Sequence, residues 1–561
     1  MIISRADAGA GLLALALLLG PVAARAAEEA PGAAEGVFSV TAPRGTASRF
    51  EARELGEPGL DGGGVLDDAH GGLGAAMWGG TDPAVIRRLL PRLPTTDSPA
   101  LRLLARRLLL TNATAPAGTA PAGGPSLLDI RVDRLTALGE SEGLAALVKA
   151  VPASLNSPTL ARARVEAALL GGDVKAACVE AATRHYDEPR LKVVCALSEG
   201  RTLEANMALD LMRDHKEADP VFLLAAEAMA GVPPAKLERI DTLAPVSLAA
   251  CRAGRLPLPP EAAATVPPGL LLAIATNPVN SADTRLAAAE RAEALGLWAT
   301  ESLRHLYTDL SFNPTETQEA LAQGPRTPRG RALLWRTIPA EDNPARRAQA
   351  IAGLLTGSAN PAAFAAAARL YAPLLTALPP GPDLAAQAAP LARALVVIDR
   401  ADLAGPWLNL AYGDPATLRQ AKAVALLRRL ARPNEEAAPI ELPAADGLSP
   451  EAAGRRAEVI LSLLEGVGEV VPPGPWLASL RDPLLSPTLS PRPALDSLAE
   501  AAATDRRLGE TVLLSLIELG QTGFDRADPA LLGRAVAMLR LVGLSTEARA
   551  LAIEIALANG V

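Results

Sequence analysis

Stretches of alanine and leucine of helix length, broken by proline and glycine, make up most of this chain. Near the C-terminus, Ala548, Leu551, Ala552 and Ile555 stand at positions i, i+3, i+4 and i+7, which places four apolar side chains on one helix face. No segment shows the sustained alternation of a half-buried strand, and residues 37–41 could form one short strand at most. The pattern therefore predicts an all-α protein.

Short polar residues precede proline unusually often. Asp, Asn or Ser stands directly before proline at fourteen places, among them Asp82-Pro83, Ser98-Pro99 and Asn360-Pro361. Such side chains cap the free N–H groups of a first helical turn. Proline fits the first helical position because its missing N–H would have no helical partner there. Most of these pairs are therefore expected to begin helices.

The helical stretches form groups separated by Pro- and Gly-rich segments. Junctions such as Gly296-Leu297 and Gly543-Leu544 mark a helix end and a restart, but their spacing shows no strict period of about 34 residues. We expect an irregular TPR-like helical-hairpin solenoid with a flexible N-terminal arm. The expected segments are a signal peptide (1–26), a flexible Gly/Ala-rich arm (27–82), helical repeats (83–255 and 269–432), a Pro-rich linker region (433–493) and a C-terminal helical group (494–561).

The first residues have the pattern of an export signal. The apolar stretch Ala8–Leu19 is shorter than the ~20 residues that span a bilayer, and Gly20-Pro21 ends it. Ala24-Arg25-Ala26 is a small-x-small cleavage site. We expect cleavage after Ala26, with an uncleaved anchor as the alternative. No later apolar run predicts a transmembrane helix.

Composition points to the compartment and limits the partners. Arginine outnumbers lysine 48 to 6, a bias typical of GC-rich bacterial genomes, and together with the signal it predicts a periplasmic protein. The formal net charge of −8 argues against nucleic acid as a partner, because phosphate binding requires a basic surface. Aromatic residues make up only 3% of the chain, so its core must consist mainly of alanine and leucine.

Three cysteines remain in the exported chain: Cys178, Cys195 and Cys251. Asp187-Glu188-Pro189 reads as a turn between two helices that carry the first two, and antiparallel helices would bring them together. In an oxidising compartment they could form a disulfide, which contributes roughly 3 kcal/mol in the chain-entropy model. Two buried thiols are the alternative. Cys251 has no evident partner.

Motifs of known chemistry are missing from the sequence. The four histidines form no H-E-x-x-H pair, and neither a G-x-S-x-G elbow nor a phosphate-binding G-x-x-x-x-G-K-[ST] loop occurs. The run Asp67-Asp68-Ala69-His70 reads as a polar turn rather than a metal site. We therefore expect no catalytic residues, no cofactor, no metal and no enzymatic activity. Trp78, Trp298 and Trp407 are candidates for an interface, with core positions as the alternative.

One enzyme family resembles this chain in architecture. Exported lytic transglycosylases carry an Ala-rich helical solenoid before a lysozyme-like domain, and Glu301-Ser302 is similar to their catalytic Glu-Ser dipeptide. Their Gly-Leu-Met-Gln segment does not follow here, so Glu301 is expected to be a surface helix residue.

The whole chain resembles a loose group of exported Ala/Leu-rich helical-repeat proteins of alphaproteobacteria. The resemblance rests on residues 74–80, 104–110 and 542–552, and on the Cys195 helix with the Ala/Leu-rich helix after it. The group implies an exported helical protein and no activity. Some members have been given an antifreeze label, but antifreeze helices need regularly spaced threonines, and threonine here is sparse and irregular.

These observations lead to a functional expectation. The chain is expected to be a periplasmic scaffold or regulator that binds protein partners of an envelope assembly, because helical solenoids offer long surfaces for other chains. The alternative is a peptidoglycan-associated binder or a divergent glycan-cleaving enzyme.

Overall fold

The computed structural model describes residues 60–116, 118, 124–215, 219–233, 236–240, 242–435, 438–442, 447–480 and 492–561. The expected signal peptide, the first part of the expected arm and the strand considered at 37–41 lie outside the described residues.

The described residues are helical throughout, as the sequence predicted, and their one β feature is an isolated parallel bridge between Leu66 and Thr111. The first half contains α1 (Pro83–Leu89), α2 (Pro99–Leu110), α3 (Leu127–Leu138), α4 (Ser141–Ala150), α5 (Pro158–Gly171), α6 (Val174–Arg184), α7 (Pro189–Ser198), α8 (Thr202–His215), α9 (Pro220–Met229), α10 (Pro245–Ala253), α11 (Ala262–Thr265), α12 (Leu271–Ala275), α13 (Ala282–Ala294) and α14 (Thr300–Asp309). The second half contains α15 (Pro314–Gln323), α16 (Pro328–Thr337), α17 (Pro344–Thr356), α18 (Pro361–Leu370), α19 (Ala372–Thr376), α20 (Ala385–Val397), α21 (Ala401–Gly413), α22 (Leu418–Ala431), α23 (Pro450–Val467), α24 (Pro473–Ser479), α25 (Pro493–Thr504), α26 (Leu508–Gly520), α27 (Pro529–Leu541) and α28 (Ser545–Ala558).

The polar residue before proline caps a helix at most of the predicted places. Nine of the eleven pairs within the described residues begin a helix, with the polar side chain accepting a first-turn N–H and proline in the first turn. The capping residues are Asp82, Ser98, Ser157, Asp219, Asn313, Asn343, Asn360, Ser449 and Asp528.

Two pairs form turns instead. The Asn277 and Asp414 side chains accept N–H groups two residues ahead, at 3.1 and 2.9 Å, and no helix starts there. The same dipeptide suits both structures, because Asx side chains initiate turns as readily as helices.

Consecutive helices pack on one another, as in α5 with α6, α9 with α10 and α20 with α21. Their buried side chains are mainly Ala, Leu, Val and Ile. The described residues from Leu60 to Val561 belong to one compact unit. The Pro-rich segment 257–268 does not interrupt its core, since Leu258 and Val266 are buried.

The expected linker region 433–493 contains a long core helix, which corrects the sequence interpretation. α23 buries Val459, Ile460, Leu463 and Leu464 and packs mainly on α27. Proline and acidic residues flank this apolar run on both sides and obscured it in the sequence. Part of the linker region, residues 436–437, 443–446 and 481–491, lies outside the described residues.

Residues 60–82, expected to belong to a flexible arm, are packed against the helices. Leu73, Met77 and Trp78 are buried, and the Val65 N–H donates to the Leu110 carbonyl at 2.9 Å. Gly64 explains why a Gly-rich segment can pack here. A Cβ at this position would lie 2.4 Å from the Leu110 oxygen, so only glycine permits the approach.

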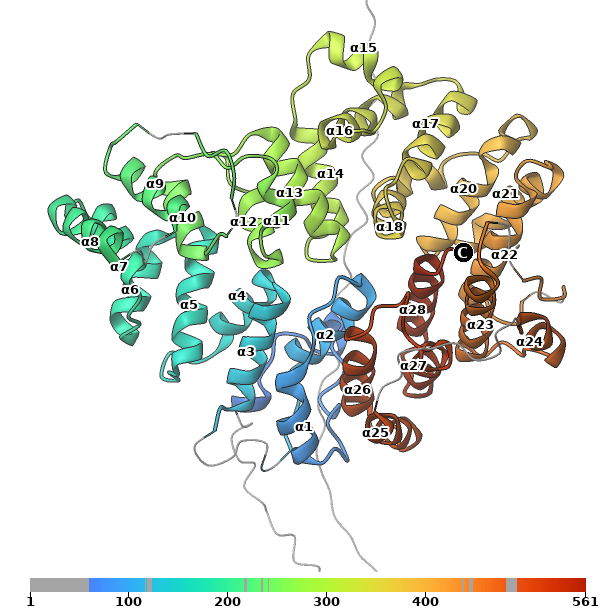
Figure 1. The fold of residues 1–561 in the computed structure, drawn as a ribbon, viewed down its shortest axis with the longest axis horizontal. Coiled ribbons are helices and arrows are strands. Elements are labelled where there is room, and N and C mark those ends of the chain that lie inside the picture. Colours follow the sequence, from blue (N-terminus) through green and yellow to red (C-terminus); the bar gives the residue numbers. More distant parts are fainter. Residues whose placement is uncertain are drawn as a thin grey trace, which may run out of the picture. The chain divides into compact units, whose positions relative to one another are not determined.

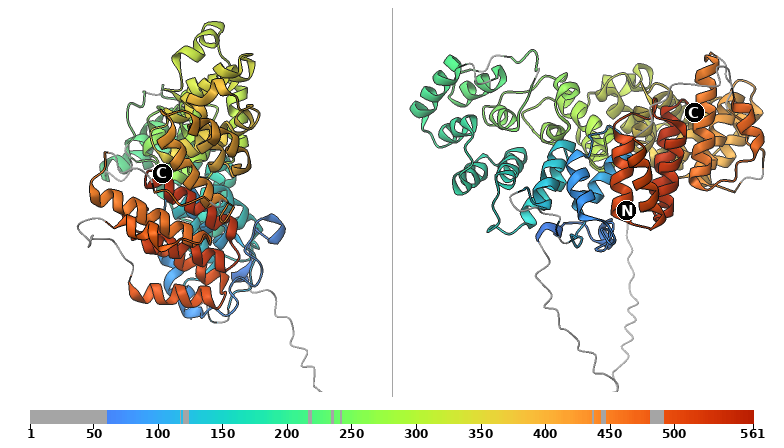
Figure 2. Two further views of the ribbon diagram at one scale, coloured as in Figure 1. Left: turned by 90° about the vertical axis from the view of Figure 1, so that its right-hand side faces the viewer. Right: turned by 60° about the horizontal axis from the view of Figure 1, so that its bottom comes forward.

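The first helices of the described chain contact the last ones. α2 packs on α26 and α28, and α1 also packs on α26 (Figure 1). The Ala100 N–H donates to Glu554 Oε2 at 3.0 Å, so a residue of α28 caps the start of α2. Arg107 pairs with Glu547, and the Gly509 N–H donates to the Met77 carbonyl at 2.8 Å. The blue and red helices lie side by side again in the right-hand view of Figure 2.

Among the described residues, no helix combines the length and the apolar character needed to cross a membrane.

Candidate functional site

A cavity of about 540 Å³ lies between α13, α14, α16, α17 and α18, and its walls consist largely of small side chains. We call it the Ala-lined cleft. Its alanines come from several helices and from the segments beside them: Ala263, Ala264, Ala287, Ala294, Ala359, Ala363, Ala366 and Ala367. Such walls leave room for the backbone of a bound chain.

Two buried tyrosines border the Ala-lined cleft. The Tyr307 hydroxyl donates to Glu290 Oε1, and the Tyr371 hydroxyl donates to the Arg331 carbonyl at 2.7 Å. Burial, with the neighbouring Glu290 charge as the second cause, raises the pKa of both phenols well above the ordinary value. Both hydroxyls therefore stay protonated and act as fixed donors at neutral pH.

Glu290 of α13 and Arg331 of α16 form a fork-like pair at the cleft. Arg331 Nε donates to Glu290 Oε1 at 3.0 Å, Nη2 donates to Oε2, and Nη1 donates to the Pro325 carbonyl at 2.8 Å. Burial lowers the pKa of Arg331, but the hydrogen bond and the charge of Glu290 outweigh burial and raise it. With both oxygens engaged, Glu290 is poorly suited to act as a general base.

A second ion pair ties α13 to α18. Glu293 is 2% exposed and accepts from Arg369 Nε at 2.9 Å and Nη2 at 3.1 Å. The Thr300 hydroxyl donates to the same carboxylate at 2.6 Å. These bonds join the walls of the cleft, and both of its carboxylates, half-buried Glu290 and buried Glu293, have guanidinium partners.

The two remaining arginines of the Ala-lined cleft, Arg291 and Arg326, differ in their contacts. Arg291 is held by the Ala263 and Val266 carbonyls, each at 2.8 Å. Arg326 is exposed and has no hydrogen-bond or ion-pair partner among the described residues. The cleft thus combines small apolar side chains with one exposed guanidinium that has no partner among the described residues.

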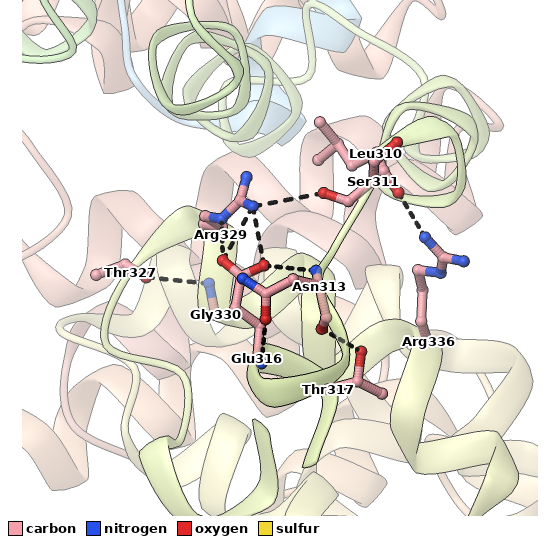
Figure 3. A network of polar contacts seen from close by, with 9 residues as sticks. All are labelled: Leu310, Ser311, Asn313, Glu316, Thr317, Thr327, Arg329, Gly330 and Arg336. Carbon is pink, nitrogen blue, oxygen red and sulfur yellow. Dashed lines mark hydrogen bonds and ion pairs between the residues drawn. The ribbon is translucent and has the colours of Figure 1, made fainter. Parts of the chain in front are cut away.

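A cavity of about 500 Å³ lies beside α14, α15 and α16, and a polar network borders it (Figure 3). The Asn313 side chain accepts the Glu316 N–H at 2.8 Å, while Glu316 accepts the Asn313 N–H at 2.8 Å and the Arg329 Nε at 3.0 Å. The hydrogen bond from Arg329 lowers the pKa of Glu316. Arg329 and Arg336 also lie over the Phe312 ring, at 5.0 and 5.6 Å from its centre. These contacts satisfy one another and fix the start of α15.

The structure contains the predicted disulfide. Cys178 of α6 and Cys195 of α7 are bonded, with their Cα atoms 5.8 Å apart, and both residues line a third cavity of about 470 Å³. Cys251 is a free, buried thiol. The intervening turn lies where the sequence placed it, with His185 as the left-handed cap of α6.

The tryptophan candidates do not meet at one surface. Trp78 and Trp407 are 5% and 2% exposed and belong to the core, so the interface interpretation is wrong for these two. Trp298 is half-buried against the core. In a chain with 3% aromatic residues, these large rings serve to fill the gaps that alanine leaves.

The polar residues singled out in the sequence have local roles. Asp67 accepts the His70 N–H at 2.9 Å and the His70 ring nitrogen at 2.6 Å, which confirms the polar turn. Glu301 is an exposed residue in the first turn of α14, as expected, and pairs with Arg304 at 2.7 Å. The described residues contain no group of His, Cys, Asp and Glu able to hold a metal ion.

Sequence reasoning missed the residues of the Ala-lined cleft. Glu290 and Arg331 are 41 positions apart, so no local motif joins them. The available signal was the rarity of tyrosine, because Tyr307 and Tyr371 are two of only four in the chain.

Comparison of the chain with protein-family models, with curated proteins and with solved structures found no match.

Proposed function

We propose that this chain is an exported helical-repeat protein of the periplasm that holds an extended segment of an envelope protein in the Ala-lined cleft. The proposal treats the consecutive helices as TPR-like hairpins that form a scaffold. It is supported by the pairwise packing of neighbouring helices and by the apolar, small-residue walls between α13 and α18.

The proposal rests on which charged side chains of the cleft already have ion-pair partners. Its carboxylates, Glu290 and Glu293, are bonded to guanidinium groups, while Arg326 is exposed and has no partner among the described residues. A bound peptide would need to supply apolar or small side chains for the walls and one carboxylate for Arg326. Neither requirement calls for catalysis, so we propose a non-enzymatic role.

A peptide suits this cleft better than a glycan. Sugar rings are commonly held against the open face of an aromatic side chain, but Tyr307 and Tyr371 are buried and their hydroxyls are engaged. The Ala-rich walls, in contrast, allow the close approach that an extended backbone requires.

Site-specific photocrosslinking in the producing bacterium tests the proposal. A photoreactive side chain at Ala366, inside the cleft, should give a discrete adduct with one envelope protein, and the same group at exposed Ala550 on α28 should not. In a second experiment, the Ala366→Trp substitution fills the cleft and should abolish co-purification of that envelope protein. Equal adducts at both positions, or retention of the mature protein on sacculi without a protein adduct, would refute it.

A further inference from the structure

The Cys178–Cys195 disulfide lies at the wall of a cavity. Both residues are half-buried, and both line the cavity of about 470 Å³ between α6, α7 and the start of α8. Both residues are therefore partly exposed at the wall of this cavity, and Cys195 also packs against the core. A disulfide within the core would be shielded from an attacking thiol by its neighbours.

Cys251, the third cysteine, is an unbonded thiol and is fully buried. Cys251 of α10 is 0% exposed, and burial, with the charge of Asp219 as a second cause, raises the pKa of its thiol to about 12. A protonated, enclosed thiol does not react as a nucleophile. The chain thus combines one partly exposed disulfide with one inert thiol.

The helix that carries Cys178 packs mainly on α5 and less extensively on α7. α6 buries only Ala177 and Ala181 and makes its main contacts with α5 and α7, while its Val179 is 65% exposed. Two buried methyl groups provide little apolar contact. The disulfide is the covalent tie that keeps α6 on α7.

The negative charges at the cavity are largely compensated by cations. Four carboxylates line it, and each has a cationic partner: Asp187 with Lys192, Glu188 with Arg190, and both Glu199 and Glu204 with Arg201. His185 is also exposed there. Because three cations pair with the four carboxylates, an anion approaching the sulfurs meets one net negative charge rather than four.

We propose that the Cys178–Cys195 disulfide is a thiol–disulfide exchange site that a dithiol reductant opens in the folded protein, and that its reduction releases α6 from α7 while α5 still holds it. One thiolate of the dithiol attacks a cysteine sulfur, the S–S bond breaks, and the other cysteine leaves as a thiolate that takes a proton from water. The second thiol of the reductant then displaces the first cysteine, so the dithiol is oxidised to a disulfide and the protein gains two thiols. The partner class is a dithiol, such as the reduced active site of a thiol–disulfide oxidoreductase.

Differential alkylation of the mature protein tests accessibility. The folded protein is treated with dithiothreitol without denaturant, alkylated with iodoacetamide and analysed by peptide mass spectrometry. Cys178 and Cys195 should become labelled nearly completely, and Cys251 should stay unlabelled as the internal control for folding. The proposal is overturned if the pair resists reduction until denaturant also exposes Cys251, or if the pair is already labelled without reductant.

Hydrogen exchange tests the release of α6. Reduction should raise amide exchange in α6 by about tenfold or more while α28 is unchanged. The variant with both Cys178→Ser and Cys195→Ser should show the raised exchange with or without dithiothreitol, and Cys251→Ala should behave as the parent. Unchanged α6 exchange in a fully reduced protein would refute the release.

Discussion

Glu518 of α26 is a deeply buried acid, and Glu518→Gln is expected to stabilise the protein at pH 8. The side chain is 3% exposed, and neither carboxyl oxygen has a hydrogen-bond partner among the described residues. Burial, with the charge of Asp496 as the second cause, raises its pKa from 4.5 to about 7, and Arg534 opposes both effects. Ionising this group in the folded state is therefore unfavourable.

The magnitude follows from the pKa shift. Each unit corresponds to about 1.4 kcal/mol, so the full shift corresponds to about 3 kcal/mol. Because the folded pKa is above the unfolded one, the folded state binds more protons between these values, and stability falls as pH rises from 4.5 to about 7. The loss is complete above that range. Glutamine has the same shape and cannot ionise, so it removes the loss.

Urea unfolding at pH 5 and pH 8, followed by circular dichroism, measures the effect. The gain of Glu518→Gln over the parent should be larger at pH 8 than at pH 5 by roughly 2 kcal/mol. Glu500→Gln is the matched control, because Glu500 is exposed on the neighbouring α25. Equal gains at both pH values, or a loss of stability at pH 8, would show that the buried carboxyl is not the source of the effect.

Three further changes test other contacts. Asn360→Ala removes the N-cap hydrogen bond from the Ala363 N–H and should lower the free energy of unfolding in urea by about 1 kcal/mol, whereas Asn360→Asp should change it little. An unchanged unfolding midpoint for the alanine variant would contradict the capping role. Arg429→Ala removes the guanidinium that lies 3.1 Å from Glu469, whose side chain is 3% exposed. The free energy of unfolding in urea should fall by about 3–5 kcal/mol, and a change below about 1 kcal/mol would refute the role of this ion pair. Cys178→Ser with Cys195→Ser should lower stability by about 3 kcal/mol in calorimetry, and the reduced parent should match the variant.

The helix starts and the disulfide could be predicted because the residues that form them are close together in the sequence. The Ser98-Pro99 and Asn360-Pro361 pairs begin helices since the capping group and the N–H groups it binds lie within three residues of each other. The disulfide between Cys178 and Cys195 was equally accessible to reasoning, as only one turn separates their helices.

The features that the sequence did not predict depend on contacts between segments that are far apart in the chain. Trp78 lies in the segment expected to be a flexible Gly/Ala-rich arm, yet Gly509, far along the chain, packs against its ring. The Glu290–Arg331 pair and the Ala-lined cleft likewise require several helices to assemble before they exist. Composition and spacing do not encode which helix meets which, so these features could not be predicted from a single sequence.

The contact of α2 with α28 determines the order in which this protein can complete its fold. A chain that emerges N-terminus first presents α2 long before α28, whose Glu554 caps it at Ala100, has appeared. Bringing such distant segments together costs loop-closure entropy that the earlier helices cannot recover alone. Until the last helix arrives, the faces of α1 and α2 that α26 and α28 cover stay exposed, so a stalled or truncated chain would present apolar surface for aggregation at its first helices rather than at its broken end.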